Sequence, residues 1–189
     1  MPAIIEPRSE LIPDPATVTA LVSQLVEGPW PRSDQDREVL FRRLRLKSGE
    51  RLDHDADESS TASFTLLTEV PGISFASWNL FRGKFMSVHF HLYVFPEAEA
   101  TATRLGHDAV SSQLTDLYGQ PIRPWEDEDV PPSIWKANGR EIVTHLFTMR
   151  DSTLMLSISD EDLAEAAEAE AEAEAINGSR TPVKNDPSP

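Results

Sequence analysis

The spacing of hydrophobic residues along the chain predicts two helices at its start. Over residues 15–26, apolar side chains recur every three or four positions, as they do on the buried side of a helix. A second helix is predicted over residues 34–44, where Ser33 or Asp34 can cap its first turn. Residues 42–47 also alternate as they would in a strand, so the sequence leaves the end of this helix open.

Three strand-like runs follow a polar loop at residues 48–60. They cover residues 64–70, 73–81 and 85–95. Pro71-Gly72 forms a turn after the first run, and Arg82-Gly83-Lys84 suits a hairpin connection between the second and the third. The third run alternates most clearly between an apolar and a more polar side. The apolar side carries Val88, Phe90, Leu92 and Val94, and the other carries Ser87, His89, His91, Tyr93 and Phe95.

A long amphipathic helix is expected over residues 97–118. Gly106 lies inside this pattern, where glycine costs roughly 1 kcal/mol relative to alanine, and it predicts a kink or a break. Further along, Asn138-Gly139 is the strongest hairpin signal of the chain. The remaining strands are predicted at residues 133–137, 141–149 and 153–159, followed by an alanine- and glutamate-rich helix at residues 160–176.

This order of elements predicts an α+β fold. We expect an antiparallel meander sheet of about five to six strands, with helices packed on one face and an acidic C-terminal helix added to it. No strand–helix–strand alternation occurs, which disfavours a doubly wound nucleotide-binding fold. The predicted units are a flexible N-terminus (1–12), a single α+β domain (13–159), the acidic helix (160–176) and a disordered tail (177–189).

The charge of the chain is concentrated near its end. The 189 residues carry a net charge of −15, and residues 151–189 contribute ten acidic against two basic side chains. This balance disfavours nucleic acid and anionic membranes as partners. Cysteine is absent, which excludes a disulfide framework, a thiol nucleophile and a thiolate metal site. The chain shows neither a secretory signal pattern nor an apolar stretch of bilayer length, so we predict a cytoplasmic protein.

Two histidines in the run at residues 85–95 are the main candidates for metal chemistry. His89 and His91 lie two positions apart on a strand, so both imidazoles point to the same side. His145 is the only histidine placed to supply a third ligand, and no carboxylate lies at a spacing that completes the set. We therefore interpret the pair as polar residues on the less buried side of a sheet. A small metal-dependent enzyme using His89 and His91 remains a third hypothesis.

The other patterns predict no catalytic residue, no metal site and no cofactor. The chain has no G-x-S-x-G motif and no glycine-rich phosphate loop. A basic stretch at residues 37–51 contains few aromatic residues, unlike a nucleic-acid contact. We interpret it as a solvated helix face or as an intramolecular partner for acidic segments.

Candidate contacts for a protein partner come from the polar strand side, the tryptophans and an acidic loop. Tryptophan is enriched at binding hot spots, although core packing is its more common role. The acidic C-terminal helix is interpreted either as a solubilising extension or as an arm that engages a basic partner. The residues that we select as partner-binding candidates are Trp78, His89, His91, Tyr93, Trp125, Glu126, Asp127, Glu128 and Asp129.

In size, charge and element order the chain resembles the bacterial immunity proteins that neutralise a cognate toxin. It also resembles the small acidic chaperones of secreted effectors, whose layout is similar to the α-β-β-β-α-β-β-α core over roughly residues 15–175. The first resemblance implies a non-catalytic, antitoxin-like module that occludes another protein, with a basic toxin as the expected partner. The second implies an acidic chaperone that forms a homodimer and binds unfolded effector segments.

Overall fold

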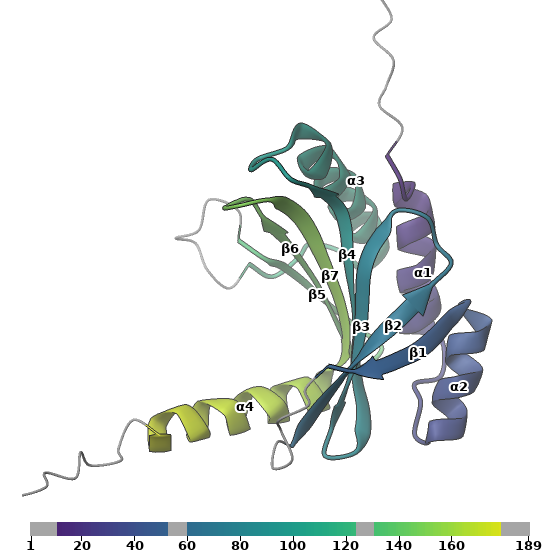
Figure 1. Cartoon of the computed structure of the whole chain (residues 1–189), viewed down its shortest axis with the longest axis vertical. Coiled ribbons are helices and arrows are strands. Elements are labelled where there is room, and N and C mark those ends of the chain that lie inside the picture. The colour runs from purple at the N-terminus through teal and green to yellow at the C-terminus, as the bar shows by residue number, and fades with distance from the viewer. Residues whose placement is uncertain (1–10, 53–59, 124–130, 179–189) are drawn as a thin grey trace, which may run out of the picture.

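Seven antiparallel strands form a single sheet in the order β1-β2-β3-β4-β7-β6-β5 (Figure 1). The computed structural model describes residues 11–52, 60–123 and 131–178. Its elements are α1 (Pro15–Glu27), α2 (Asp34–Arg43), β1 (Leu46–Arg51), β2 (Thr61–Thr68), β3 (Ile73–Phe81), β4 (Lys84–Phe95), α3 (Thr101–Tyr118), β5 (Ser133–Ala137), β6 (Arg140–Phe147), β7 (Ser152–Asp160) and α4 (Glu161–Gly178).

Two meanders make up the sheet. Strands β1 to β4 form the first and β5 to β7 the second, and α3 connects them so that β4 pairs with β7 at the centre. The predicted α+β class and antiparallel arrangement are confirmed, with seven strands instead of five to six. None of the helices in the described ranges is long and apolar enough to cross a membrane.

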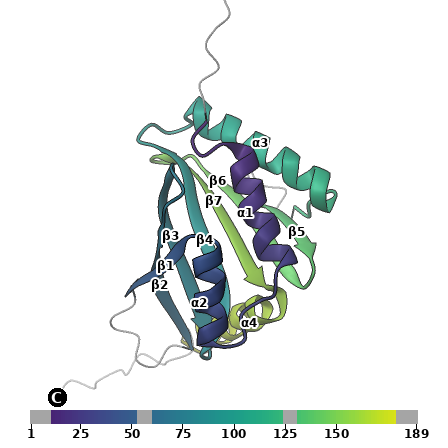
Figure 2. The ribbon, with the colours of Figure 1, turned by 90° about the vertical axis from the view of Figure 1, so that its right-hand side faces the viewer.

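The helices α1, α2 and α3 lie on the same face of the sheet (Figure 2). Val88, Phe90 and Leu92 of β4 point to this face and are almost completely buried. They stand opposite apolar residues of β7 in the antiparallel register, so the two central strands present one continuous apolar surface to the helices. Burial of this surface, at about 25 cal/mol per Å², is the main source of stability for the body.

The additional strand is β1, which lies at the edge of the sheet. Residues 48–60 were expected to form a loop, but Leu46–Arg51 pairs with β2. Only Leu46 of this strand is buried, and its other residues are exposed or half-buried. The strand-like alternation at residues 42–47 overlaps only the first two residues of β1. The rest of this edge strand buries no side chain and so has no period-two hydrophobic pattern to reveal it.

Two short turns behave as their sequences predict. Asn138 and Gly139 join β5 to β6 with φ angles of 52° and 69°. Arg82 and Gly83 join β3 to β4 with φ angles of 49° and 74°. Positive φ at both central residues suits the right-handed twist of a hairpin, and both predicted hairpins are confirmed.

The alternation of β4 breaks at Tyr93. This residue has a φ of 51°, and the pairing with β7 shifts register between Leu92 and Phe95. The side chain therefore turns to the helix side, where its hydroxyl donates a hydrogen bond to the carbonyl of Pro13 at 2.7 Å. The sequence pattern had placed Tyr93 on the same side as His89 and His91, and the bulge is the reason for the difference.

Gly106 does not interrupt α3, which runs unbroken from Thr101 to Tyr118. A Cβ at this position would lie 2.5 Å from Cε2 of Tyr93. The glycine therefore provides the space that the Tyr93 ring occupies, and the break that the sequence allowed at this position does not occur.

The acidic helix α4 begins directly after β7 and points away from α1, α2 and α3 (Figure 1). Asp160 caps its first turn, accepting a hydrogen bond from the backbone of Leu163 at 3.2 Å. Ion pairs of Lys136 on β5 with Glu161, at 2.8 Å, and of Arg82 at the β3–β4 turn with Glu170 tie residues 161–170 of α4 to the sheet. Residues 171–176 are exposed throughout, so the second half extends beyond the sheet.

Candidate functional site

The face of the sheet opposite α1, α2 and α3 is one candidate site, and we call it the open sheet face. One row of it crosses four strands in register: Phe75 pairs with His91, His91 with Met155, and Met155 with His145. The next row is mainly polar and contains Ser77, His89 and Ser157. A third row contains Asn79, Ser87 and Ser159 and ends at Glu141 and Lys136.

The first row is rich in aromatic and histidine rings. Phe75 packs edge-to-face against His91 with ring centroids 5.5 Å apart. The ring centroids of His145 and Phe147 lie 4.3 Å apart. Phe75 remains 43% exposed and Phe147 38% exposed. Large apolar side chains on a sheet face are normally covered by another layer, so this row is a surface suited to contact with a partner.

His89 is held as a neutral imidazole in the middle of the open sheet face. Its Nε2 lies 2.9 Å from the Asn79 amide nitrogen and 2.9 Å from the Ser87 hydroxyl. The amide nitrogen can only donate, so Nε2 is the acceptor, and its single lone pair is shared by these two neighbours. Burial, with a smaller contribution from the neighbouring His91, lowers the pKa of His89 to about 4. Burial also lowers the pKa of His91, partly offset by Asp151.

This arrangement does not favour a metal site at His89 and His91. The lone pair on Nε2 of His89 already accepts a hydrogen bond from the Asn79 amide. Among the described residues, no group of three or more histidine, aspartate or glutamate side chains could hold a metal ion. His145 does lie on the same face as His91, but Met155 stands between them in the register.

Two other candidate residues from the sequence lie in the core. Trp78 is 2% exposed, its ring stacks on Phe64 at 4.4 Å, and its indole nitrogen donates to Ser48 at 3.1 Å. Tyr93 is 3% exposed and packs below Gly106. Both side chains stabilise the fold, and neither is presented on the open sheet face. Trp125 and the acidic run Glu126 to Asp129 lie outside the described residues.

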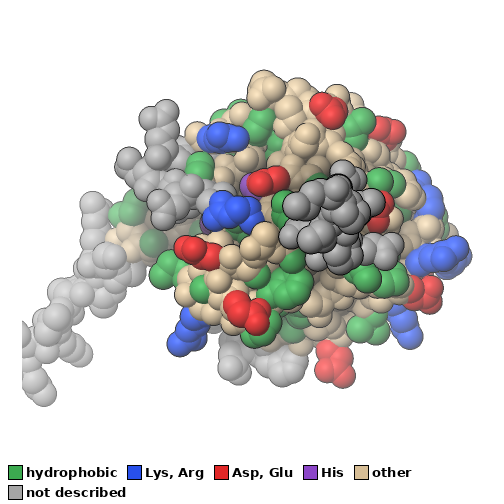
Figure 3. Space-filling view, turned by 90° about the horizontal axis from the view of Figure 1, so that it is seen from above, with side chains coloured by type: hydrophobic (Ala, Val, Ile, Leu, Met, Phe, Trp, Pro, Cys, Tyr) green, Lys and Arg blue, Asp and Glu red, His purple; other side chains and the backbone are tan. Residues whose placement is uncertain are grey.

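The acidic helix α4 borders the open sheet face at its lower end in Figure 1. Glu141 of β6 is half-buried there, and burial raises its pKa. Lys136 opposes this shift, whereas Glu161, Glu165 and Glu168 of α4 reinforce it. The carboxylates of the helix are therefore close enough to act electrostatically on the sheet face. The opposite end of the molecule differs, because basic and acidic side chains are interspersed there among hydrophobic ones (Figure 3).

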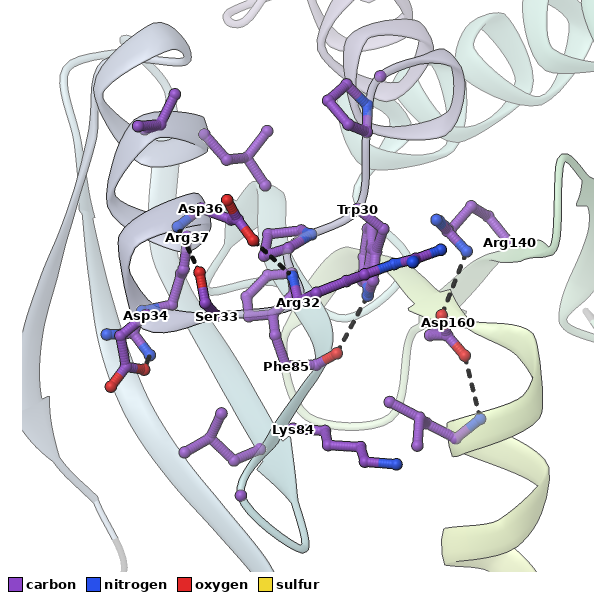
Figure 4. Close-up of a pocket in the computed structure, with 18 of the residues that line it drawn as sticks. Trp30, Arg32, Ser33, Asp34, Asp36, Arg37, Lys84, Phe85, Arg140 and Asp160 are labelled. Carbon is purple, nitrogen blue, oxygen red and sulfur yellow. Dashed lines mark hydrogen bonds and ion pairs between the residues drawn. The ribbon is translucent and has the colours of Figure 1, made fainter.

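A second feature is a cleft of about 1010 Å³ on the other side of the sheet, which we call the Trp30 cleft. It lies between the α1–α2 connection, α2, the β3–β4 turn and the start of α4 (Figure 4). Trp30 donates its indole N–H to the carbonyl of Phe85 at 3.0 Å, and their rings lie 4.9 Å apart. The Arg140 guanidinium stacks over the Trp30 ring at 4.5 Å.

Sequence reasoning did not identify the Trp30 cleft. Its charged residues Arg32, Lys84 and Arg140 are far apart along the chain, and each follows or precedes a turn. The only available signal was Trp30 itself, a large aromatic residue between two prolines in an expected loop. Comparison with protein-family models, curated proteins and solved structures finds no match for this chain.

Proposed function

We propose that the protein is a non-catalytic binding module of the immunity or antitoxin kind, which occludes a basic partner protein. The observation that carries this proposal is the pairing of the open sheet face with α4. A partly exposed aromatic row lies on a sheet face that no helix of the described residues covers, and an acidic helix borders it.

The charge of α4 defines the chemistry of the partner. Residues 161–178 contain seven acidic side chains and no lysine or arginine. Carboxylates of α4 raise the pKa of Glu141, so their field reaches the open sheet face itself. A cationic surface would relieve this repulsion, and the same field would accelerate its approach.

The aromatic row would then supply the short-range contacts. Phe75, His91, Met155 and His145 lie side by side across four strands, and strands of one sheet hold such a row rigidly. Aromatic side chains contribute large contact area with little loss of conformational freedom, as binding hot spots require.

The test uses basic proteins encoded by genes adjacent to that of this protein, purified with it after coexpression. We expect a stable complex whose affinity falls as salt concentration rises. Replacing Phe75 and Phe147 together by serine should weaken the complex by about tenfold or more, which corresponds to roughly 1.4 kcal/mol.

Leu105→Ser is the matched control. Leu105 is 55% exposed on α3, which packs on the opposite face of the sheet, so this variant also removes an exposed apolar side chain. It should bind as the parent protein does. Salt-independent binding, or equal losses in the control and in the double variant, would contradict the proposal.

An acidic chaperone for a secreted effector is the second candidate, and the edge position of β1 favours it. An outer strand can pair with an extended segment of another chain, as effector-binding surfaces require. A homodimer in light scattering that binds an unfolded effector segment, but no folded basic protein, would select this alternative.

A further inference from the structure

The charged side chains that line the Trp30 cleft sum to +1 in a strongly acidic protein. Five basic side chains line it, together with four aspartates, although the chain as a whole carries −15. Two of the aspartates are committed to ion pairs, Asp34 with Arg37 and Asp160 with Arg140 at 3.2 Å. A third, Asp36, accepts the backbone N–H of Arg32 at 3.2 Å, and the fourth is Asp162.

Two guanidinium groups converge beside Trp30. Arg140 lies flat over the indole ring, and the Arg32 side chain extends towards it across the cleft (Figure 4). Burial lowers the pKa of Arg140, Asp160 opposes this shift, and the positive charge of Arg32 adds to it. The two cations therefore repel each other, and the carboxylate of Asp160 neutralises only one of the two positive charges.

Several donors in the cleft have no protein acceptor. Within the described ranges, neither the Arg32 guanidinium nor the Lys84 ammonium forms a hydrogen bond or an ion pair. The Nε atoms of Arg37 and Arg140 are buried without a hydrogen-bond partner among the described residues. The Arg32 and Lys84 side chains are exposed, so an acceptor bound in the cleft can reach their donors, whereas the two buried Nε atoms are out of its reach.

The cleft also suits a small ligand in size and in its walls. Its volume lies at the upper end of the range for small-molecule sites. Trp30 and Phe85 provide an aromatic wall, and hydrogen bonds fix the position of the indole. The first turns of α2 and α4 both line the cleft, and the partial positive charge of a helix N-terminus adds to the field of the cations.

We propose that the Trp30 cleft binds the phosphate group of a small phosphorylated molecule, with Arg32 and Arg140 as its principal ligands. Guanidinium groups match the oxygen geometry of phosphate and bind it through paired N–H donors. Lys84, at the β3–β4 turn, supplies a third cation at the rim of the cleft. The site is separate from the open sheet face and does not depend on the proposed function.

The experiment is a titration of the full-length protein with inorganic phosphate and with phenyl phosphate, followed by nuclear magnetic resonance. The indole N–H of Trp30 is the reporter, and the Trp30→Phe variant assigns its signal. We expect saturable shifts of this signal and of the backbone signals of Lys84 and Phe85. Arg32→Ala should weaken the binding of both ligands by about tenfold or more, because it removes a charge-assisted contact to the phosphate. Arg32 is exposed, so the variant should still fold.

Arg42→Ala is the matched control, since Arg42 is an exposed arginine of the same helix region that does not line the cleft. Its affinity for phosphate should equal that of the parent protein. Three outcomes would each overturn the proposal: no saturable shift at Trp30, equal losses in Arg32→Ala and Arg42→Ala, or acetate binding as tightly as phosphate at matched ionic strength.

Discussion

Gly106 and Tyr93 form one packing unit although they belong to different elements. The tyrosine ring lies where a side chain of α3 would otherwise project, and its hydroxyl bonds to Pro13 ahead of α1. Burial raises the pKa of this hydroxyl, so it stays protonated and acts as a donor. A single ring thus connects β4, α3 and the segment that leads into α1.

Gly106→Ala should lower the free energy of unfolding by about 1 kcal/mol, the cost of overpacking less the gain in helix propensity. Overpacking against Tyr93 costs roughly 1–3 kcal/mol, and the gain of about 1 kcal/mol in helix propensity offsets only part of it. Urea denaturation measures the change.

The same substitution in a Tyr93→Ala background separates the clash with the Tyr93 ring from the gain in helix propensity. Without the ring there is no clash, so Gly106→Ala should now be neutral or stabilising by up to about 1 kcal/mol. A stabilised single variant, or equal losses in both backgrounds, would contradict this account of the glycine.

His89 makes the stability of the protein depend on pH. Its pKa falls from 6.5 to about 4 on folding, so the unfolded chain binds a proton that the folded protein does not. Stability should therefore be complete above pH 6.5 and decline as the pH falls towards 4, with a loss of about 3 kcal/mol. Protonation would also remove the acceptor that Asn79 and Ser87 use.

Urea unfolding of the parent protein and of His89→Gln across this pH range measures the effect. The variant should show a smaller loss, with the remainder from groups such as His91, whose pKa burial also lowers. Identical pH profiles for the two proteins would show that His89 does not carry the dependence.

At the scale of elements, α4 differs from the other helices in how it is held. Its first half is anchored by the Asp160 cap and by ion pairs with Lys136 and Arg82. Residues 171–176 are exposed, and Glu172 and Glu174 there lie four residues after the like-charged Glu168 and Glu170. The helix is therefore a weakly attached extension of a body whose core it scarcely enters.

Removing residues 161–189 should leave the sheet folded and cost no more than about 2 kcal/mol. Exposed ion pairs contribute little to the free energy of unfolding. Among the half-buried residues of α4, Leu163 has the largest apolar side chain, so little apolar burial is lost with the helix. Circular dichroism and thermal unfolding measure this outcome, and loss of the cooperative transition would contradict it.

The truncation also tests the role of α4 in binding a basic partner. The complex of the truncated protein with the basic partner should be weaker than that of the parent protein, and its affinity should depend less on salt concentration. A variant with Glu165, Glu168 and Glu172 changed to glutamine keeps the helix but not these charges, so it should reproduce the change in salt dependence. Unchanged binding in both proteins would leave α4 with a solubilising role only.

At the scale of the whole molecule, two surfaces of different chemistry share one sheet. The open sheet face carries aromatic side chains and is bordered by the carboxylates of α4, whereas guanidinium groups line the Trp30 cleft on the helix side. Helix α4 touches both, because its first turn lines the cleft and later carboxylates act on Glu141. A structure with one covered and one open sheet face can present both surfaces without compromising its core.

The sequence by itself determined those features that depend on local patterns. The α+β class, both hairpins with positive φ, the helical periods and the position of the acidic helix follow from spacing and turn residues, and the structure confirms them. The pairing of His89 and His91 on one side of a strand also follows from the two-residue period.

Only the tertiary structure decided the features that depend on distant partners. Strand β1 forms because β2 is available to pair with it, and Tyr93 turns inward because Gly106 leaves room for its ring. Trp78 is buried by contacts from several elements, and the Trp30 cleft assembles from the α1–α2 connection, β4, β6 and the start of α4. Local patterns encode the direction in which a side chain points, but the neighbours that it meets are decided by how the whole chain packs.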